Sequence, residues 1–306
     1  MTKNIFLLIG PTASGKSSIS LQLTRDFPFE VINADLYSVY KGMNIGTAKP
    51  NLAEFSSTRH YLFNKLDPDM NYNVSEYCFD AVDSIDKVFA NNKYPLITGG
   101  SMMYIYQLLN GLSHDYNILD TDKKIISYIL EKYTYPEIYK SLIDGKEIFN
   151  GKINPNDKYR IEKLLERLIS PNNDKKKYKG LYLNKNISIK IIFINICDRE
   201  LLRTNIFKRT SHMLKSGLID EVENLKQKYN LTLENQSMKA IGYKQVLSYL
   251  DNNTELVNLV NSISLATQQL AKRQLTWRNK FKVDYYHNYP ELDYKALHDF
   301  ISKSLA

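Results

Sequence analysis

A phosphate-binding loop close to the N-terminus constrains the fold more than any other feature of the chain. Residues Gly10 to Ser17 read Gly-Pro-Thr-Ala-Ser-Gly-Lys-Ser, a complete Walker A motif, and they directly follow the apolar run Ile5–Ile9. Such a loop needs a strand before it and a helix after it, because its backbone N–H groups converge on a phosphate at the helix N-terminus. We therefore predict a strand at Ile5–Ile9, a helix at Ser17–Asp26, and a phosphorylated ligand bound by Gly10, Pro11, Thr12, Ala13, Ser14, Gly15, Lys16 and Ser17.

The chemistry of the bound phosphate is left open by the loop alone. Lys16 would add a positive charge, and the Ser17 hydroxyl could hold Mg²⁺. The same groups are compatible with three kinds of protein: one that cleaves ATP, one that transfers a phosphoryl group, and one that binds a pyrophosphate for other chemistry.

Apolar runs that alternate with helical patterns indicate the fold class. Val31–Ala34 and Leu96–Thr98 are typical of short buried strands, and Ile187–Ile196 is the clearest strand of the second half. We expect an α/β protein with a P-loop NTPase-like core, in which helices flank a parallel sheet. Helical patterns at Asp122–Glu131 and Asp157–Ile169 predict a helical insertion domain at residues 114–185, between core segments 1–113 and 186–306. After Ile196 we again predict helices, at Leu201–Leu214, at Ile219–Lys228 and from about Thr254 to Phe281.

Composition narrows the class of protein. The 306 residues are 43% hydrophobic, which supports a sizeable core, and no apolar run approaches the roughly 20 residues of a membrane span. Met1–Asn4 leads directly into the first strand, so we expect a cytoplasmic protein without a signal peptide. Cys78 and Cys197 lack metal-ligand spacing and are expected to be reduced thiols. The net charge of +8 suits an anionic partner, although a bias towards lysine explains it equally well.

Asp35 is a candidate for the site, and arginines are a further type of residue to consider. The second predicted strand ends at Asn33-Ala34-Asp35, and open α/β sheets bind ligands at the carboxyl ends of their strands. Asp35 could be a general base, a Mg²⁺ partner, or only a capping residue. Arginine grips phosphate better than lysine, and only nine of the 41 basic residues are arginines. Taken by themselves, arginines such as Arg160 and Arg209 are most often solvated surface charges.

The segment after Asp35 carries a longer motif. Residues Asp35 to Pro50 read Asp-Leu-Tyr-Ser-Val-Tyr-Lys-Gly-Met-Asn-Ile-Gly-Thr-Ala-Lys-Pro. This block resembles the tRNA dimethylallyltransferase family, also called tRNA isopentenyltransferases, whose members show Asp-Ser-x-x-Val/Ile-Tyr-x-Gly-Met-x-Ile-Gly-Thr-Ala-Lys-Pro. Leu36 and Ser38 depart from the family pattern. The resemblance extends over residues 5 to 282 through Gly99–Ile105, Asn154–Arg160, Arg209–Val222, Ala240–Lys244 and Gln269–Trp277.

The resemblance implies a reaction and roles within it. The family transfers a dimethylallyl group from dimethylallyl diphosphate to N6 of adenosine 37, next to the tRNA anticodon, with Mg²⁺ as cofactor. Asp35 matches the general base that removes the N6 proton, and Ser101 replaces a threonine near the transferred group. The P-loop, Mg²⁺ at Ser17, Arg160 and Arg209 would stabilise the diphosphate leaving group.

The resemblance also implies that a monomer binds the anticodon stem-loop of tRNA. Basic side chains would contact phosphates, and the target base would be splayed out of its stack. Trp277 continues the apolar stripe of its helix, so we expect it to pack in the core, with base stacking as the alternative. The residues expected to bind tRNA are Asp35, Leu36, Tyr37, Ser38, Ser101, Lys124, Tyr159, Arg160, Ile161, Glu162, Lys163, Lys239, Ala240, Ile241, Gly242, Tyr243, Lys244, Lys272, Arg273, Gln274, Leu275, Thr276, Trp277, Arg278 and Asn279.

Two other functions compete with this one. A P-loop kinase of a nucleoside or small metabolite would use Lys16 and Ser17 to hold ATP, but it would not need a basic C-terminal helix. An RNA-binding protein with a vestigial loop would not need Lys16, Ser17 and Asp35 together.

Overall fold

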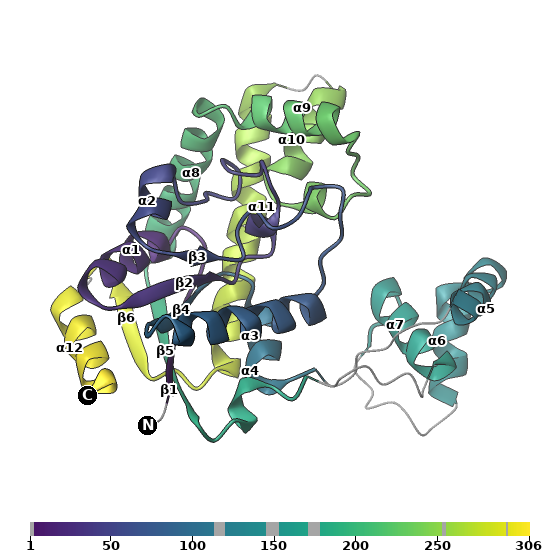
Figure 1. The fold of residues 1–306 in the computed structure, drawn as a ribbon. Helices are drawn as coiled ribbons and strands as arrows, with labels where there is room; N and C mark the ends of the chain where they lie inside the picture. The colour runs from purple at the N-terminus through teal and green to yellow at the C-terminus, as the bar shows by residue number, and fades with distance from the viewer. Residues whose placement is uncertain (1–2, 113–119, 145–152, 171–177, 253–254, 292) are drawn as a thin grey trace. The chain divides into compact units, whose positions relative to one another are not determined.

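A six-stranded parallel sheet forms the centre of the fold. The computed structural model describes residues 3–112, 120–144, 153–170, 178–252, 255–291 and 293–306. The sheet order is β3-β2-β4-β1-β5-β6, and every neighbouring pair is parallel (Figure 1). The predicted fold class is confirmed. The strands are β1 (Lys3–Ile9), β2 (Phe29–Asn33), β3 (His60–Tyr61), β4 (Tyr94–Gly99), β5 (Ile187–Ile196) and β6 (Tyr285–Tyr289).

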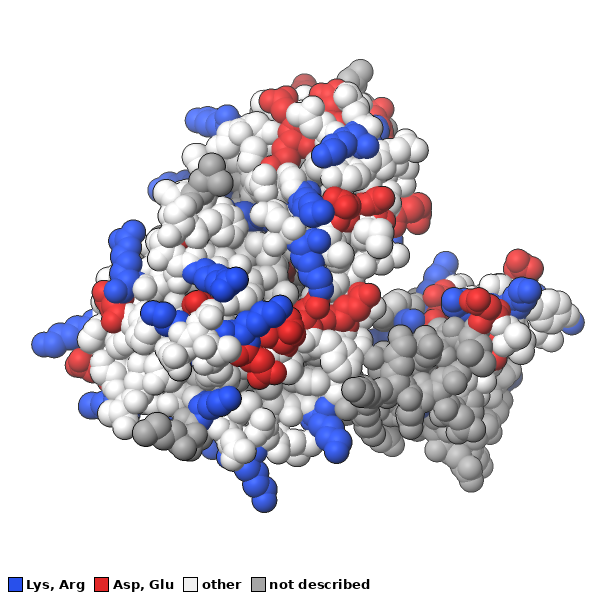
Figure 2. All heavy atoms as spheres, in the orientation of Figure 1, with Lys and Arg blue, Asp and Glu red and all other residues white. Residues whose placement is uncertain are grey.

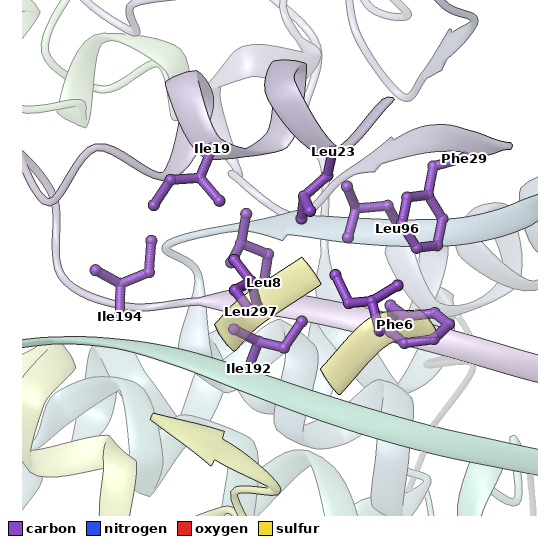
Figure 3. Packing of buried hydrophobic residues seen from close by; sticks show 10 residues of the cluster. Phe6, Leu8, Ile19, Leu23, Phe29, Leu96, Ile192, Ile194 and Leu297 are labelled. Carbon is purple, nitrogen blue, oxygen red and sulfur yellow. The ribbon is translucent and has the colours of Figure 1, made fainter. Parts of the chain in front are cut away.

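The central strand β1 is buried because its residues from Ile5 to Ile9 are continuously apolar. Residues Ile5 to Ile9 of β1 have no exposed surface, as expected for a strand covered on both faces. One face of the sheet packs against α1 (Lys16–Asp26) and α12 (Tyr294–Leu305). Figure 3 shows this cluster, which brings together the buried side chains Phe6, Leu8, Ile19, Leu23, Phe29, Leu96, Ile192, Ile194, Leu297 and Ile301.

Side-chain caps determine where several helices begin. Asn73 accepts hydrogen bonds from the amides of Ser75 and Glu76 at the start of α3 (Val74–Ala90), and Asp198 caps α8 (Arg199–Lys215) in the same way. The other helices of the larger part of the chain are α2 (Leu52–Ser57), α4 (Met102–Asn110), α9 (Leu218–Tyr229), α10 (Tyr243–Asn252) and α11 (Leu256–Trp277). The predicted helices at Leu201–Leu214 and Ile219–Lys228 match α8 and α9 closely. Among the described residues, no helix is both long and apolar enough to cross a bilayer.

The chain divides into two compact units. One comprises residues 1–111 and 179–306, and the other comprises residues 112–178. The second unit contains α5 (Asp120–Lys132), α6 (Tyr135–Asp144) and α7 (Lys158–Ile169). It overlaps the segment 114–185 that we assigned to an insertion, but residues 179–185 group with the first unit because the 3₁₀ turn Leu181–Leu183 contacts α4 and β5.

Candidate active site

A cavity of about 390 Å³, here called the P-loop cavity, lies at the carboxyl ends of the strands. Its floor is the loop Thr12–Ser17, between β1 and α1. Its walls come from the ends of β2 and β4, from the segment Thr47–Pro50, and from α8 and α11. Residues more than 200 positions apart in the sequence therefore surround one space.

The P-loop has a shape that suits an anion. Ala13 and Gly15 have φ values of +60° and +82°, the left-handed conformation that turns successive amides towards one side. Lys16 Nζ donates hydrogen bonds to the carbonyl oxygens of Gly10 at 3.0 Å and Pro11 at 2.5 Å. Burial, with the neighbouring charge of Arg209, lowers the pKa of Lys16 to about 7. A bound anion would favour the protonated ammonium again.

Asp35 lies directly beyond β2 and is held by its own strand. Asn33 Oδ1 accepts a hydrogen bond from the Asp35 amide at 2.9 Å, and Asn33 Nδ2 donates to the carbonyl oxygens of Asp35 and Leu62. The carboxylate accepts a hydrogen bond from the Tyr37 amide at 3.1 Å. Burial raises the pKa of Asp35, while the Tyr37 amide, Lys16 and Arg209 oppose the rise. A raised pKa brings a carboxylate closer to the range in which a general base is effective near neutral pH.

Two side chains connect β4 with the other walls. Ser101 Oγ accepts a hydrogen bond from the Leu36 amide at 2.9 Å, which fixes the segment after Asp35. Gln274 of α11 is buried; its Oε1 accepts from the Thr12 amide at 2.8 Å, and its Nε2 donates to the Gly100 carbonyl oxygen at 2.9 Å. Gln274 is among the residues we expect to bind tRNA. In the structure its side-chain amide instead connects the P-loop with the segment after β4.

A second cavity of about 260 Å³, here called the helix-side cavity, adjoins the first. The two cavities share five lining residues: Thr12, Asp35, Thr47, Arg209 and Leu270. The remaining walls of the helix-side cavity include Tyr37, Arg273 and the turn Lys239–Gly242. Asp35 and Arg209 therefore lie where the two spaces meet, and one group can act on ligands held in both.

Predicted tRNA-binding residues of the first unit differ in how far they are exposed. Lys239, Lys244, Lys272 and Arg273 are exposed, as a contact with phosphate requires. Ala240 and Tyr243 are buried, so their side chains have structural partners. Trp277 is half-buried, with its ring against Tyr106 at a centroid distance of 5.8 Å, and the Lys280 ammonium lies 4.3 Å from its ring centroid. The indole therefore packs against Tyr106 but is not fully enclosed in the core.

The second unit holds the other predicted ligands, and their roles stay predictions. Arg160 is exposed on α7 and forms an ion pair with Asp157, in which Nε lies 3.2 Å from Oδ2. Lys124, Tyr159 and Lys163 are also exposed. Ile161 is fully buried, so its side chain is open to no ligand.

Lys49 is a site residue that our sequence reasoning missed, although it lies in the motif Gly-Thr-Ala-Lys-Pro. Lys49 lines the P-loop cavity, and its ammonium donates hydrogen bonds to the Tyr40 carbonyl oxygen and to Asn64 Oδ1. Burial lowers its pKa to about 8, against the opposing charge of Glu221. Lysine inside a family motif is a signal that could have identified it.

Surface charge does not outline the site. On the face of the larger unit in Figure 2, lysine and arginine side chains are scattered among aspartate and glutamate. The net charge of +8 therefore does not by itself locate a nucleic-acid surface on this face.

Known proteins resemble this chain over most of its length. Residues 38–281 match the profile of the IPP transferase family. A tRNA dimethylallyltransferase from Nitrosospira multiformis is 36% identical over 280 residues, which are 90% of this chain and 86% of that protein. The corresponding protein of Wigglesworthia glossinidia brevipalpis is 36% identical over 292 residues, which are 94% of this chain and 90% of that protein.

Solved structures agree with the sequence matches. The tRNA delta(2)-isopentenylpyrophosphate transferase of Staphylococcus epidermidis has a TM-score of 0.69 at 30% identity, and the match covers 99% of this chain and 98% of that one. A eukaryotic dimethylallyltransferase acting on tRNA shares the fold, with a TM-score of 0.81 at 24% identity over 99% of this chain and 80% of that one. Profile, relatives and fold concur with the resemblance of the motifs, and the chain belongs to the IPP transferase family.

Proposed function

We propose that the chain is a tRNA dimethylallyltransferase acting on N6 of adenosine 37, with dimethylallyl diphosphate as the prenyl donor. The observation that carries the proposal is the junction of the P-loop cavity and the helix-side cavity at Asp35 and Arg209. The prenyl donor would bind by its diphosphate in the first cavity, and the adenosine would enter the second. The names of the similar proteins support the same activity.

Asp35 is the proposed general base. The exocyclic N6 amine is a poor nucleophile, so removal of its proton as the C–N bond forms lowers the barrier. In the step, the bond between C1 of the dimethylallyl group and the diphosphate oxygen breaks, and C1 bonds to N6. The N6 proton passes to the Asp35 carboxylate, and diphosphate leaves with the electron pair of the broken bond. Asp35 lines both cavities, as this role requires.

The P-loop and Arg209 would stabilise the leaving group. Negative charge develops on the diphosphate as the C–O bond breaks, and fixed N–H donors and cations stabilise it best in a site poor in water. Lys16 and Arg209 lie in the wall of the P-loop cavity and provide two such cations. Ser101 would orient the segment after Asp35 through its hydrogen bond to the Leu36 amide. We keep Arg160 as a further proposed ligand of the diphosphate.

Mg²⁺ fits the residues of this site as a cofactor held mainly by the substrate. Mg²⁺ prefers hard oxygen ligands and often binds one or two protein groups together with phosphate oxygens. Ser17 lines the P-loop cavity, whereas no cluster of three His, Cys, Asp or Glu side chains occurs in the described parts of the chain. The Ser17 hydroxyl would hold the ion against the diphosphate, whose charge the ion would neutralise.

One assay tests the proposed function against a P-loop kinase. The protein would be incubated with Mg²⁺, labelled dimethylallyl diphosphate and unmodified tRNA, and the label in the tRNA would be counted. We expect transfer to this tRNA and none to a control tRNA with guanosine at position 37, which has no N6 amine. Absence of transfer together with consumption of ATP in the presence of a small acceptor would overturn the proposal.

A further inference from the structure

A carboxylate holds the loop that leads from Asn44 into the wall of both cavities. Glu221 of α9 accepts hydrogen bonds from three successive backbone amides: its Oε2 from Asn44 at 2.9 Å and Ile45 at 2.8 Å, and its Oε1 from Gly46 at 3.3 Å. The Tyr243 hydroxyl donates to the same Oε1 at 2.5 Å. We call this group of contacts the Glu221 clamp. Hydrogen bonds to an ionised carboxylate are stronger than those between neutral groups.

The clamp joins the walls of both cavities. The chain continues from Gly46 to Thr47, which lines both cavities, and then to Lys49, which lines the P-loop cavity. On the other side, Tyr243 directly follows the turn Lys239–Gly242, which lines the helix-side cavity. Glu221 itself lines neither cavity, so it can influence a reaction only through the segments that it holds.

Packing supports the clamp independently of its hydrogen bonds. Tyr243 is fully buried, and its ring lies so close to Gly46 that a Cβ atom there would overlap it. A Cβ on Gly46 would also come 3.0 Å from Leu218 Cδ1. The loop therefore has one position relative to α9 and α10, fixed by shape as well as by charge.

We propose that Glu221 is a positioning residue, which sets the distance between the wall of the prenyl-donor cavity and the wall of the tRNA cavity. This inference rests on the proposed function. Misplacement of reacting groups by about 1 Å can lower a rate on the order of 10²-fold without removing any catalytic group. Loss of the clamp should therefore lower kcat more than it raises either KM, since the P-loop, Asp35 and Arg209 keep their own contacts.

The test compares four variants. Glu221→Gln keeps the shape but removes the charge, Glu221→Ala removes both, and Tyr243→Phe keeps the ring but removes the hydroxyl. Glu223→Gln is the matched control, because Glu223 lies two residues further along α9 and is exposed. Each variant would be measured by amide hydrogen exchange at residues 44–46, by steady-state transfer kinetics with both substrates, and by thermal unfolding.

We expect faster exchange at residues 44–46 in Glu221→Gln, with kcat lowered on the order of 10²-fold and each KM changed only a few-fold. Tyr243→Phe should show a smaller loss of the same kind, and Glu223→Gln should match the unaltered protein. Unchanged exchange in Glu221→Ala would overturn the clamp. If Glu221→Gln shows faster exchange but an unchanged kcat, the positioning role is overturned. The same conclusion follows if its kcat falls no further than its fraction of folded protein. If the unaltered protein transfers no label, the proposed function fails, while the exchange data still decide whether the clamp exists.

Discussion

The two cavities are assembled in different ways. The floor of the P-loop cavity is one continuous segment, Thr12–Ser17, and Lys16 donates hydrogen bonds to carbonyl oxygens only five and six residues earlier. The helix-side cavity has no such continuous floor. Its walls come from the segment after β2, from α8, from the turn Lys239–Gly242 and from α11. Local sequence therefore shapes the floor of the first cavity, whereas packing between distant segments shapes its walls and the whole of the second cavity.

This difference predicts different consequences of mutation. Changes in the P-loop should remove charge from a site that otherwise keeps its shape. Changes around the helix-side cavity should instead alter tRNA affinity or the alignment of the two substrates. Asp35 and Arg209 line both cavities. A change at either residue should therefore not follow this division between the two cavities.

The largest effect is expected at the junction. Asp35→Asn removes the base but keeps the size of the side chain, and general-base catalysis contributes about 10²- to 10⁴-fold. We expect a loss of transfer in this range, with tRNA affinity changed only a few-fold. Because burial raises the pKa of Asp35, the acidic limb of the rate profile of the unaltered protein should lie above the ordinary value of 3.8, with activity lost as the pH falls. A large loss of tRNA binding would instead make Asp35 an RNA contact.

A smaller effect, confined to the P-loop cavity, is expected for Lys16→Met. Removing one such donor costs about 10²- to 10³-fold, and tRNA affinity should not change. The pKa of Lys16 is lowered to about 7, so in the unaltered protein the ammonium is lost as the pH rises through 7. Above pH 7, binding of inorganic diphosphate should therefore be accompanied by uptake of a proton by Lys16. Calorimetry in two buffers of different ionisation enthalpy would measure this uptake. That uptake should vanish in Lys16→Met and persist in the control Lys87→Met, where the lysine is exposed on α3; equal uptake in both would contradict the prediction.

A substitution at Gln274 would test whether the hydrogen bonds of α11 hold the P-loop in place. Gln274→Met preserves the volume but leaves the Thr12 amide and the Gly100 carbonyl without their partner, at a cost of about 1–3 kcal/mol for a buried group. We expect a lower free energy of unfolding and weaker binding of diphosphate, but unchanged tRNA affinity. Gln269→Met, at an exposed position of the same helix, is the control. If the variant binds tRNA more weakly but binds diphosphate as before, Gln274 contacts RNA, as the resemblance implies, and does not support the P-loop.

The smallest effect is expected from one exposed cation. Lys272→Ala should weaken tRNA binding a few-fold and lower the slope of log affinity against log salt concentration by about 0.7–0.9, the value for one phosphate contact. Transfer at saturating tRNA should not change. Binding titrations at several salt concentrations, with the exposed Lys303→Ala on α12 as control, would measure it. An unchanged slope would place Lys272 outside the RNA surface.

The sequence predicted the parts whose determinants are adjacent in the chain. The Walker A motif with its preceding apolar run predicted β1, the P-loop and α1, because strand, loop and helix follow one another within 24 residues, Lys3 to Asp26. The isoleucine-rich segment Ile187–Ile196, which only Ser188, Lys190 and Asn195 interrupt, predicted β5 with its bounds. The long helix was predicted at 254–281, but α11 ends at Trp277, since the chain then forms a 3₁₀ turn at Arg278–Lys280.

Strands and contacts that depend on distant partners were not predicted. β6 has the sequence Tyr-Tyr-His-Asn-Tyr, which lacks an apolar run, and it is a strand because it pairs with β5. The amide of Gln274 meets the P-loop across 262 residues of chain, and Glu221 meets Asn44 across 177.

The sequence by itself determined the sheet class, the phosphate-binding loop and the identity of Asp35 as a candidate base. Each of these depends on residue order and local backbone geometry, which a motif records directly. Only the tertiary structure decided that two cavities meet at Asp35 and that Gln274 and Glu221 hold their walls. Hydrogen bonds between side chains and backbone amides carry no sequence signature on the amide side, because every residue except proline offers the same N–H group.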